Sequence, residues 1–188
     1  MNSERTLRVT AVAAVVVIAG TILVACAPAA PPAPAPQVSG MPVGGLSQEA
    51  LQAVRQYPQA LLVAQFYRPF ETGDGAVYDH IMQPGWIDVP RADGQQPGRD
   101  GLGMLIAASH TAMPNLRLHI DEIVVASDTV TVRSTLTGSQ DGPFLGVAGT
   151  GRTIAFRTTD VHHVSGGLIA STDHLEDLFG AYQQITSR

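Results

Sequence analysis

Residues 150–185 read TGRTIAFRTTDVHHVSGGLIASTDHLEDLFGAYQQI, with two runs rich in valine, isoleucine and threonine on either side of Gly166-Gly167. Such runs predict β-strands. Two glycines between them predict a tight hairpin turn, because glycine readily adopts positive φ angles. We therefore expect strands at 152–164 and 168–175, paired antiparallel around this turn.

The strand pattern continues toward the N-terminus as far as Pro114. Two more strands are expected at 116–125 and 129–138, joined by a turn at Ser127-Asp128. Within the second of them the side chains alternate with the period of a half-buried strand. One face would hold Val130, Val132, Ser134 and Leu136, and the other Thr129, Thr131, Arg133 and Thr135.

The chain before Pro114 has a helical pattern instead. The expected segments are a helix after the N-cap residue Ser47, a helix from Pro58 to Pro69, a short helix at 74–82, a loop at 83–98 around Trp86, and a helix at 100–112. Helices that precede antiparallel strands indicate an α+β fold, in which the helices pack on one face of a sheet.

The N-terminus resembles a bacterial lipoprotein signal peptide at residues 1–25. Arg5 and Arg8 precede an apolar run at 9–25, which ends in a lipobox-like Leu-Val-Ala before Cys26. Cys26 is the sole cysteine and is expected to be the lipid-anchored first residue of the mature protein. An uncleaved membrane anchor is the alternative, although the run is at the short limit for spanning. Either reading predicts attachment to the cell membrane, with the domain on the extracytoplasmic face.

A tether and a single folded domain are expected after the lipidation site. Residues 26–45 are rich in proline and alanine, a composition that favours an extended, semi-rigid spacer over a packed core. The folded domain is expected at 46–188.

The composition excludes several classes of function. The net charge of −5 argues against nucleic acid as a partner. The chain has no lysine, which excludes Schiff-base chemistry, and acylation of Cys26 would exclude a thiol nucleophile. Acid–base chemistry by Asp, Glu, His or Tyr therefore remains, together with the hydroxyls of Ser and Thr.

The region from Gln59 to Ile185 resembles the SnoaL-like polyketide cyclase (ester cyclase) family. Three blocks carry the resemblance: FYRPFETGD at 66–74, MPNLRLHIDEIVVASDTVTVRSTLTGSQDGPFLG at 113–146, and the stretch 150–185 quoted above. The last block resembles the family's final hairpin and closing helix without a gap.

The resemblance implies a nuclear transport factor 2-like cone, in which helices pack on a strongly curved, mainly antiparallel sheet around an apolar pocket. It also implies acid–base catalysis by a pocket carboxylate without a cofactor, and oligomerisation, for example as a homodimer. The best-known members close a ring by intramolecular aldol condensation. This chain departs from the family pattern at Gln140, at His163 and at Ser171-Thr172-Asp173, where the family usually has His, Arg and Glu-His-Trp.

The final hairpin supplies the candidate catalytic residues. If Ser165 pairs with Leu168, Asp160 falls opposite Asp173 and His162 opposite Ser171, on a face shared with Phe156 and Leu175. Two close carboxylates in an apolar pocket would raise one pKa, as a general acid/base requires. A register slip of one residue would instead turn Asp173 to the other face.

The predicted site extends to other residues of the chain. The candidates are Asp160, Asp173, His162 and His174 for catalysis, and Phe156, Ser171, Trp86 and Tyr78 for the ligand pocket. Glu176 is expected to be solvated and Asp177 to cap the closing helix. Because adjacent histidines in a strand point to opposite faces, no metal site is expected at His162-His163.

Three functions are compatible with these residues. The first is a cyclase- or isomerase-like enzyme that abstracts a proton next to a carbonyl in a small apolar substrate. The second is a non-catalytic ligand-binding domain, and the third is a protein-interaction module of the cell envelope. Export and the departures from the family pattern weigh against the enzyme.

Overall fold

One five-stranded sheet, in the order β1-β5-β4-β3-β2, dominates the computed structural model, which describes residues 41–42 and 44–187. The strands are β1 (Met82–Val89), β2 (Arg117–Ala126), β3 (Thr129–Gln140), β4 (Arg152–Ser165) and β5 (Leu168–Glu176). Strands β2 to β5 pair antiparallel, and β1 pairs with β5 in parallel. The four strands predicted from the sequence are therefore confirmed.

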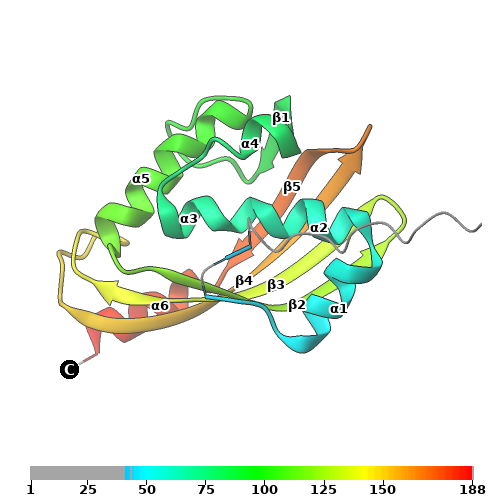
Figure 1. Cartoon of the computed structure of the whole chain (residues 1–188). Coiled ribbons are helices and arrows are strands. Elements are labelled where there is room, and N and C mark those ends of the chain that lie inside the picture. Colours follow the sequence, from blue (N-terminus) through cyan, green and yellow to red (C-terminus); the bar gives the residue numbers. More distant parts are fainter. Residues whose placement is uncertain (1–40, 43, 188) are drawn as a thin grey trace, which may run out of the picture. The chain divides into compact units, whose positions relative to one another are not determined.

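The helices pack mainly on one face of this sheet (Figure 1). They are α1 (Gln48–Gln56), α2 (Pro58–Ala64), the 3-10 turn η1 (Gln65–Tyr67), α3 (Arg68–Thr72), α4 (Tyr78–Ile81), the 3-10 turn η2 (Arg99–Gly101), α5 (Leu102–Ala112) and α6 (Leu178–Thr186). The Ser47 hydroxyl caps α1 by accepting from the Ala50 N–H, and Pro58 begins α2. The predicted α+β class is confirmed.

Two predictions before Pro114 were wrong. The expected loop at 83–98 contains the edge strand β1, which accommodates Pro84 because an edge strand does not need every N–H for pairing. The Trp86 side chain on this strand is 2 % exposed. Pro69 does not end a helix but lies in the first turn of α3, where a proline costs no helical hydrogen bond.

The β4–β5 hairpin has a bulge that the sequence did not reveal. Ser165 pairs with Leu168 as predicted, but His163 pairs with Ser171, so Ala170 is an extra residue on β5. Beyond the bulge, Asp160 pairs with His174 rather than with Asp173.

The bulge reverses the face of every β5 residue beyond it. Asp173 and Leu175 therefore lie on the face opposite to Asp160, and both are exposed. The predicted pairings of Asp160 with Asp173 and of His162 with Ser171 were wrong.

The described part of the chain packs against the domain from its first residue. Met41 is buried, and the Gly44 N–H donates to Glu71 Oε1 over 2.7 Å. Leu46 then bridges to Ile120 of β2. The predicted signal peptide at 1–25, the predicted lipidation site Cys26 and most of the predicted tether at 26–45 lie outside the described residues. No helix among residues 41–42 and 44–187 is long and apolar enough to cross a membrane.

Candidate active site

A cavity of about 500 Å³ lies between the sheet and the helices that cover it. Most of its lining side chains are apolar, and its ionisable groups come mainly from β1, β4 and β5. The apolar lining includes Phe66, Phe70, Trp86, Leu102, Leu105, Met113, Leu118, Leu136, Phe144, Leu145, Phe156 and Leu178. The acids and the histidine in the wall are Asp88, Asp160, His174 and Glu176. Such a cavity is typical of a site for a small apolar molecule with a few oriented polar contacts.

Asp160 is a nearly buried carboxyl group in this wall, with 7 % of its surface exposed. The Tyr67 hydroxyl donates to Asp160 Oδ2 over 2.8 Å, and Thr158 Oγ1 donates to the same oxygen over 3.5 Å. Oδ1 accepts no hydrogen bond from any residue in the described part of the chain. Burial raises the pKa of Asp160 to about 7, against the lowering effect of the Tyr67 hydrogen bond. The carboxyl group can therefore take up and release a proton near neutral pH.

A chain of hydrogen bonds leads away from Asp160 into the core. Besides donating to Asp160, the Tyr67 hydroxyl lies 2.8 Å from His162 Nε2. His162 Nδ1 lies 2.9 Å from Thr172 Oγ1, which accepts from Trp86 Nε1 over 3.0 Å. Burial lowers the pKa of His162 to about 3, so the ring is neutral. Burial also raises the pKa of Tyr67 well above its ordinary value, so the phenol keeps its proton.

The proton positions in this chain follow from giving each donor one acceptor. The indole of Trp86 can only donate, so Thr172 accepts from it and donates to His162 Nδ1. The Nε2–H of His162 then donates to Tyr67, which donates to Asp160. All four bonds point toward Asp160 and stabilise its carboxylate.

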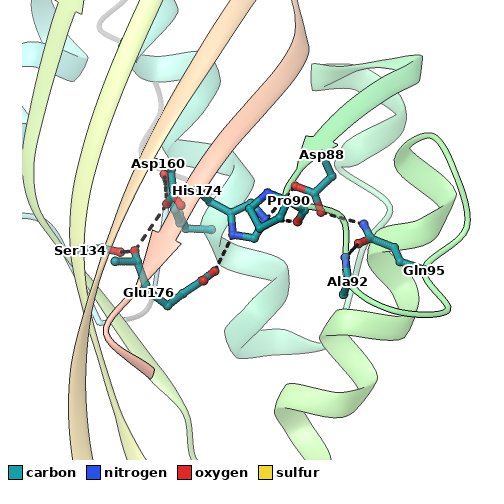
Figure 2. A network of polar contacts seen from close by, with 10 residues as sticks. Asp88, Pro90, Ala92, Gln95, Ser134, Asp160, His174 and Glu176 are labelled. Carbon is teal, nitrogen blue, oxygen red and sulfur yellow. Dashed lines mark hydrogen bonds and ion pairs between the residues drawn. The ribbon is translucent and has the colours of Figure 1, made fainter. Parts of the chain in front are cut away.

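His174 lies on the same wall between two carboxylates (Figure 2). Its Nδ1 lies 2.7 Å from Glu176 Oε1, and its Nε2 lies 3.1 Å from Asp88 Oδ1 and 2.9 Å from the Pro90 carbonyl oxygen. The hydrogen bonds to Asp88 and Glu176 raise the pKa of His174 to about 10. The imidazolium is therefore a fixed positive charge at neutral pH.

The loop after β1 orients Asp88. Gln95 Nε2 donates to Asp88 Oδ2 over 2.8 Å, and Gln95 Oε1 accepts from the Ala92 N–H over 2.9 Å (Figure 2). Gln95 is itself 5 % exposed. The buried amide of Gln95 thus fixes the position of the Asp88 carboxylate, which in turn contacts His174.

The sequence-predicted residues fall into three groups. The first comprises those that line the cavity, namely Asp160, His174, Phe156 and Trp86. His162 is one step behind the wall and contacts it through Tyr67. Ser171 and Asp173 do not join them: Asp173 Oδ2 forms an exposed ion pair with His163 Nε2, 3.7 Å away on the opposite face.

The remaining predictions concern the edges of the site. Tyr78 lines a separate cavity of about 370 Å³, and its buried hydroxyl donates to the Phe66 carbonyl oxygen. Asp177 caps α6 as predicted, by accepting from the Gly180 N–H. Glu176 faces the cavity and His174, contrary to the expectation that it is solvated. Residues 41–42 and 44–187 contain no cluster of three His, Asp or Glu side chains that could hold a metal ion.

Sequence reasoning missed Tyr67, Asp88 and Glu176. An aromatic residue in a helix, such as Tyr67, has the pattern of an ordinary core residue. Asp88 lay in the expected loop, so it had no predicted sheet face. The position of Glu176 on the cavity face follows from the alternation of β5 only when the bulge is known.

Comparisons with known proteins agree with this architecture. The family model of the SnoaL-like polyketide cyclases matches residues 61–185. TsrD from Streptomyces laurentii is similar in structure, with a TM-score of 0.63 and 25% sequence identity over 76% of this chain and 98% of that chain. No curated protein matches the sequence.

Two further solved structures share the fold at lower identity. IdmH from Streptomyces antibioticus has a TM-score of 0.60 and 20% identity, over 69% of this chain and 99% of its own. A SnoaL-like polyketide cyclase from Agrobacterium tumefaciens has a TM-score of 0.58 and 12% identity, over 68% of this chain and 97% of its own.

Proposed function

We propose, since the chain belongs to the SnoaL-like polyketide cyclase family, that the domain carries out cyclase- or isomerase-type acid–base chemistry on a small apolar carbonyl compound. The observation that carries this proposal is the environment of Asp160. One carboxylate oxygen is held by Tyr67 and Thr158, and the other has no partner among the described residues. Asp160 lies in an apolar wall and has a pKa of about 7.

Asp160 would act as the general base and then as the general acid. The carboxylate takes the proton from the carbon next to the substrate carbonyl, which leaves an enolate. After ring closure or movement of the double bond, the protonated Asp160 returns the proton. A group with a pKa near the working pH performs both halves of this cycle efficiently.

His174 would supply the electrostatic part of the mechanism. When Asp160 takes up the proton, the negative charge moves from the carboxylate to the substrate oxygen. The imidazolium is fixed between Asp88 and Glu176, so it needs no reorganisation, and its positive charge offsets part of the repulsion between these carboxylates and the charge on the substrate. His174 is also the cross-strand partner of Asp160.

A second candidate function is a non-catalytic ligand-binding or protein-interaction domain of the cell envelope. The observation that favours it is that both ring nitrogens of His174 already bond to protein groups. Gln140, where the family usually has His, is likewise occupied by bonds to the Gly142 and Ala148 carbonyls. Neither side chain has a free donor for a carbonyl oxygen, whereas the apolar cavity needs none to bind a ligand.

The proposal extends to the location of the domain. We infer from the sequence of residues 1–26 that Cys26 is the lipid-anchored first residue of the mature protein, so that the Pro/Ala-rich tether holds the domain at the extracytoplasmic face of the membrane. Mass spectrometry of the mature N-terminus tests this directly. We expect a lipid on Cys26 and its loss in Cys26→Ala, and an unmodified wild-type N-terminus would contradict it.

The catalytic proposal is tested by exchange of the α-protons of 2-tetralone in D2O, followed by NMR. We expect the purified wild-type domain to accelerate exchange, and Asp160→Asn to lose at least about 100-fold of that acceleration, the usual size of a general-base effect. Asp173→Asn is the matched control and should keep the wild-type rate. If 2-tetralone binds without any exchange, the ligand-binding function is the correct one.

A further inference from the structure

The loop between β3 and β4 has an unusual leucine at its tip. The Phe144 N–H donates to the Val147 carbonyl and the Val147 N–H to the Phe144 carbonyl, both over 2.9 Å, so Leu145-Gly146 forms a two-residue hairpin turn. Both turn residues have positive φ, 51° at Leu145 and 77° at Gly146. Two positive φ angles are the signature of a type I′ turn, which strongly favours Asn, Asp or Gly at both positions. Leucine is sterically strained there.

A network of hydrogen bonds holds the base of this loop in place. Gln140 is completely buried, and its Nε2 donates to the Gly142 and Ala148 carbonyls over 2.6 and 3.1 Å. Its Oε1 accepts from the N–H and the hydroxyl of Thr150. The N–H groups of 141 and 142 both donate to the Ala112 carbonyl at the end of α5. The Gln140 side chain therefore connects the two ends of the loop through hydrogen bonds.

The Leu145 side chain lines the cavity. Its neighbour Phe144 packs on Phe156 of β4, with ring centroids 5.9 Å apart. Phe156 and Asp160 lie on the same face of β4 and are four residues apart, which is about 13 Å along the strand. The hairpin therefore lines the cavity at the end away from Asp160.

We infer that Leu145 is a specificity-determining residue, whose side chain limits the length of ligand that the cavity accepts. Backbone strain persists only where the surrounding structure imposes it, and strained residues cluster at functional sites. The chemical class that fits is an elongated apolar carbonyl compound, with its carbonyl at Asp160 and its apolar end against Leu145. The position of the carbonyl rests on the proposed function, whereas the role of Leu145 as a wall does not.

The competing explanation is that Leu145 serves only the packing of the loop. It contacts a hydrophobic cluster that includes Met113, Ile154 and Phe156. The two roles predict different responses to Leu145→Asn. This substitution relieves the backbone strain, but it removes the apolar wall.

The chain offers a matched control in the β2–β3 turn. Ser127 is the other described non-glycine residue with a positive φ, 58°, and it is exposed on the surface. Ser127→Asn changes the same kind of backbone position without touching the cavity lining. Any difference between the two variants in ligand binding is then due to the side chain of Leu145.

The experiment uses Nile red, a neutral apolar dye, and alkyl phenyl ketones of increasing chain length as competitors. Dye binding needs no catalysis, so the result is independent of whether Asp160 exchanges protons. We expect wild type and Ser127→Asn to bind the short ketones and reject the longest. Leu145→Asn should bind the short ketones at least about tenfold more weakly and accept longer ones, with a melting temperature within about 3 °C of wild type.

Two results would overturn the inference. An unchanged preference for chain length in Leu145→Asn would show that this side chain sets no limit. A fall in melting temperature of more than about 3 °C, with weaker binding of all ketones alike, would show that Leu145 is a packing residue. In that case Leu145→Met, which keeps most of the apolar volume, should restore the melting temperature and the binding of all ketones together.

Discussion

The two adjacent histidines of β4 point to opposite faces of the sheet and meet opposite environments. His162 is completely buried, lies 2.8 Å from the Tyr67 hydroxyl, and has its pKa lowered by burial to about 3. His163 is about half exposed, and its Nε2 lies 3.7 Å from Asp173 Oδ2 on the outer face. The difference shows that in this hairpin the sheet face, and not the residue type, determines whether a polar side chain is buried and how far its pKa shifts.

Asp160 and Asp173 of the same hairpin differ in the same way. Asp160 faces the cavity, and its pKa is raised to about 7 because burial disfavours its charged form. Asp173 is exposed, and its ion pair with His163 is screened by water. The hairpin therefore has an inner set, Asp160 and His162, and an outer set, Asp173 and His163. A substitution in the inner set can be compared with the same substitution in the outer set.

The largest expected difference is between His162→Ala and His163→Ala. The first change leaves a cavity beside Phe66 and removes a partner from both Tyr67 and Thr172, which should cost about 5 kcal/mol of unfolding free energy. The second change removes an exposed ion pair and should cost less than about 0.5 kcal/mol. Urea unfolding at pH 7 measures both. Similar losses for the two variants would contradict the contrast between the faces.

The second prediction concerns Asp160→Asn and the pH dependence of stability. The folded-state pKa of about 7 is above the ordinary value of 3.8, so the stability contributed by the protonated group is present below pH 4 and is lost as pH rises through 7. At pH 8 the wild type has to hold a buried charge. Asparagine removes that charge and should raise the unfolding free energy by about 2 to 3 kcal/mol.

The comparison is sharpened by following the variant across pH. We expect the gain in Asp160→Asn to shrink as pH falls from 8 to 5, because the wild-type acid becomes neutral. Asp173→Asn should show no such trend. A gain that is constant with pH would mean that the charge of Asp160 is not its source.

The sequence predicted the strands and the turn of the β4–β5 hairpin better than it predicted which side chains face the cavity. The Gly166-Gly167 turn and the pairing of Ser165 with Leu168 are confirmed, since glycine requirements at a turn are visible in the residues themselves. The bulge at Ala170 is not visible, because it depends on how β5 fits against β1 and β4. One extra residue was enough to place His174, instead of Asp173, opposite Asp160.

The other errors have the same origin in tertiary packing. Pro84 and Gly85 gave β1 the composition of a loop, and only its pairing with β5 makes it a strand. Tyr67 had the pattern of a core residue, and its hydroxyl became part of the site because β4 brings Asp160 and His162 beside it. Local composition therefore predicted the four strands after Pro114, whereas β1 and the polar contacts depended on neighbours distant in the sequence.

A third prediction tests the hydrogen bond that connects the inner set. Tyr67→Phe removes the donor that stabilises the Asp160 carboxylate, so the pKa of Asp160 should rise above about 7. The loss of a charge-assisted hydrogen bond should cost about 1.5 to 3 kcal/mol of stability. The pH midpoint of α-proton exchange of 2-tetralone should move upward with the pKa.

Tyr78→Phe is the control for that variant. Its buried hydroxyl donates to the Phe66 carbonyl oxygen and not to Asp160. We expect a loss of stability of about 1 kcal/mol and an unchanged midpoint. An equal midpoint shift in both tyrosine variants would assign the effect to packing.

The smallest expected effect has the opposite sign and comes from Glu176→Gln. The charge of Glu176 raises the pKa of Asp160 by repulsion between the two carboxylates. Glutamine removes that repulsion, so the pKa should fall and the exchange midpoint should move downward by a fraction of a pH unit. His174 keeps its contacts with Asp88 and the Pro90 carbonyl oxygen, so its position should be preserved.

The control for Glu176→Gln is Glu122→Gln, which removes the same charge from the surface pair with Arg133 on β2 and β3. Its exchange midpoint should equal that of wild type.

The loss of Glu176 also lowers the pKa of His174, because the Glu176 hydrogen bond is one cause of its raised value. If His174 lost its charge near neutral pH in the variant, it would no longer stabilise the Asp160 carboxylate, and the midpoint would move up instead of down. A downward shift thus shows that Asp88 alone keeps the imidazolium charged, whereas an upward shift would contradict the prediction and show that both carboxylates are needed.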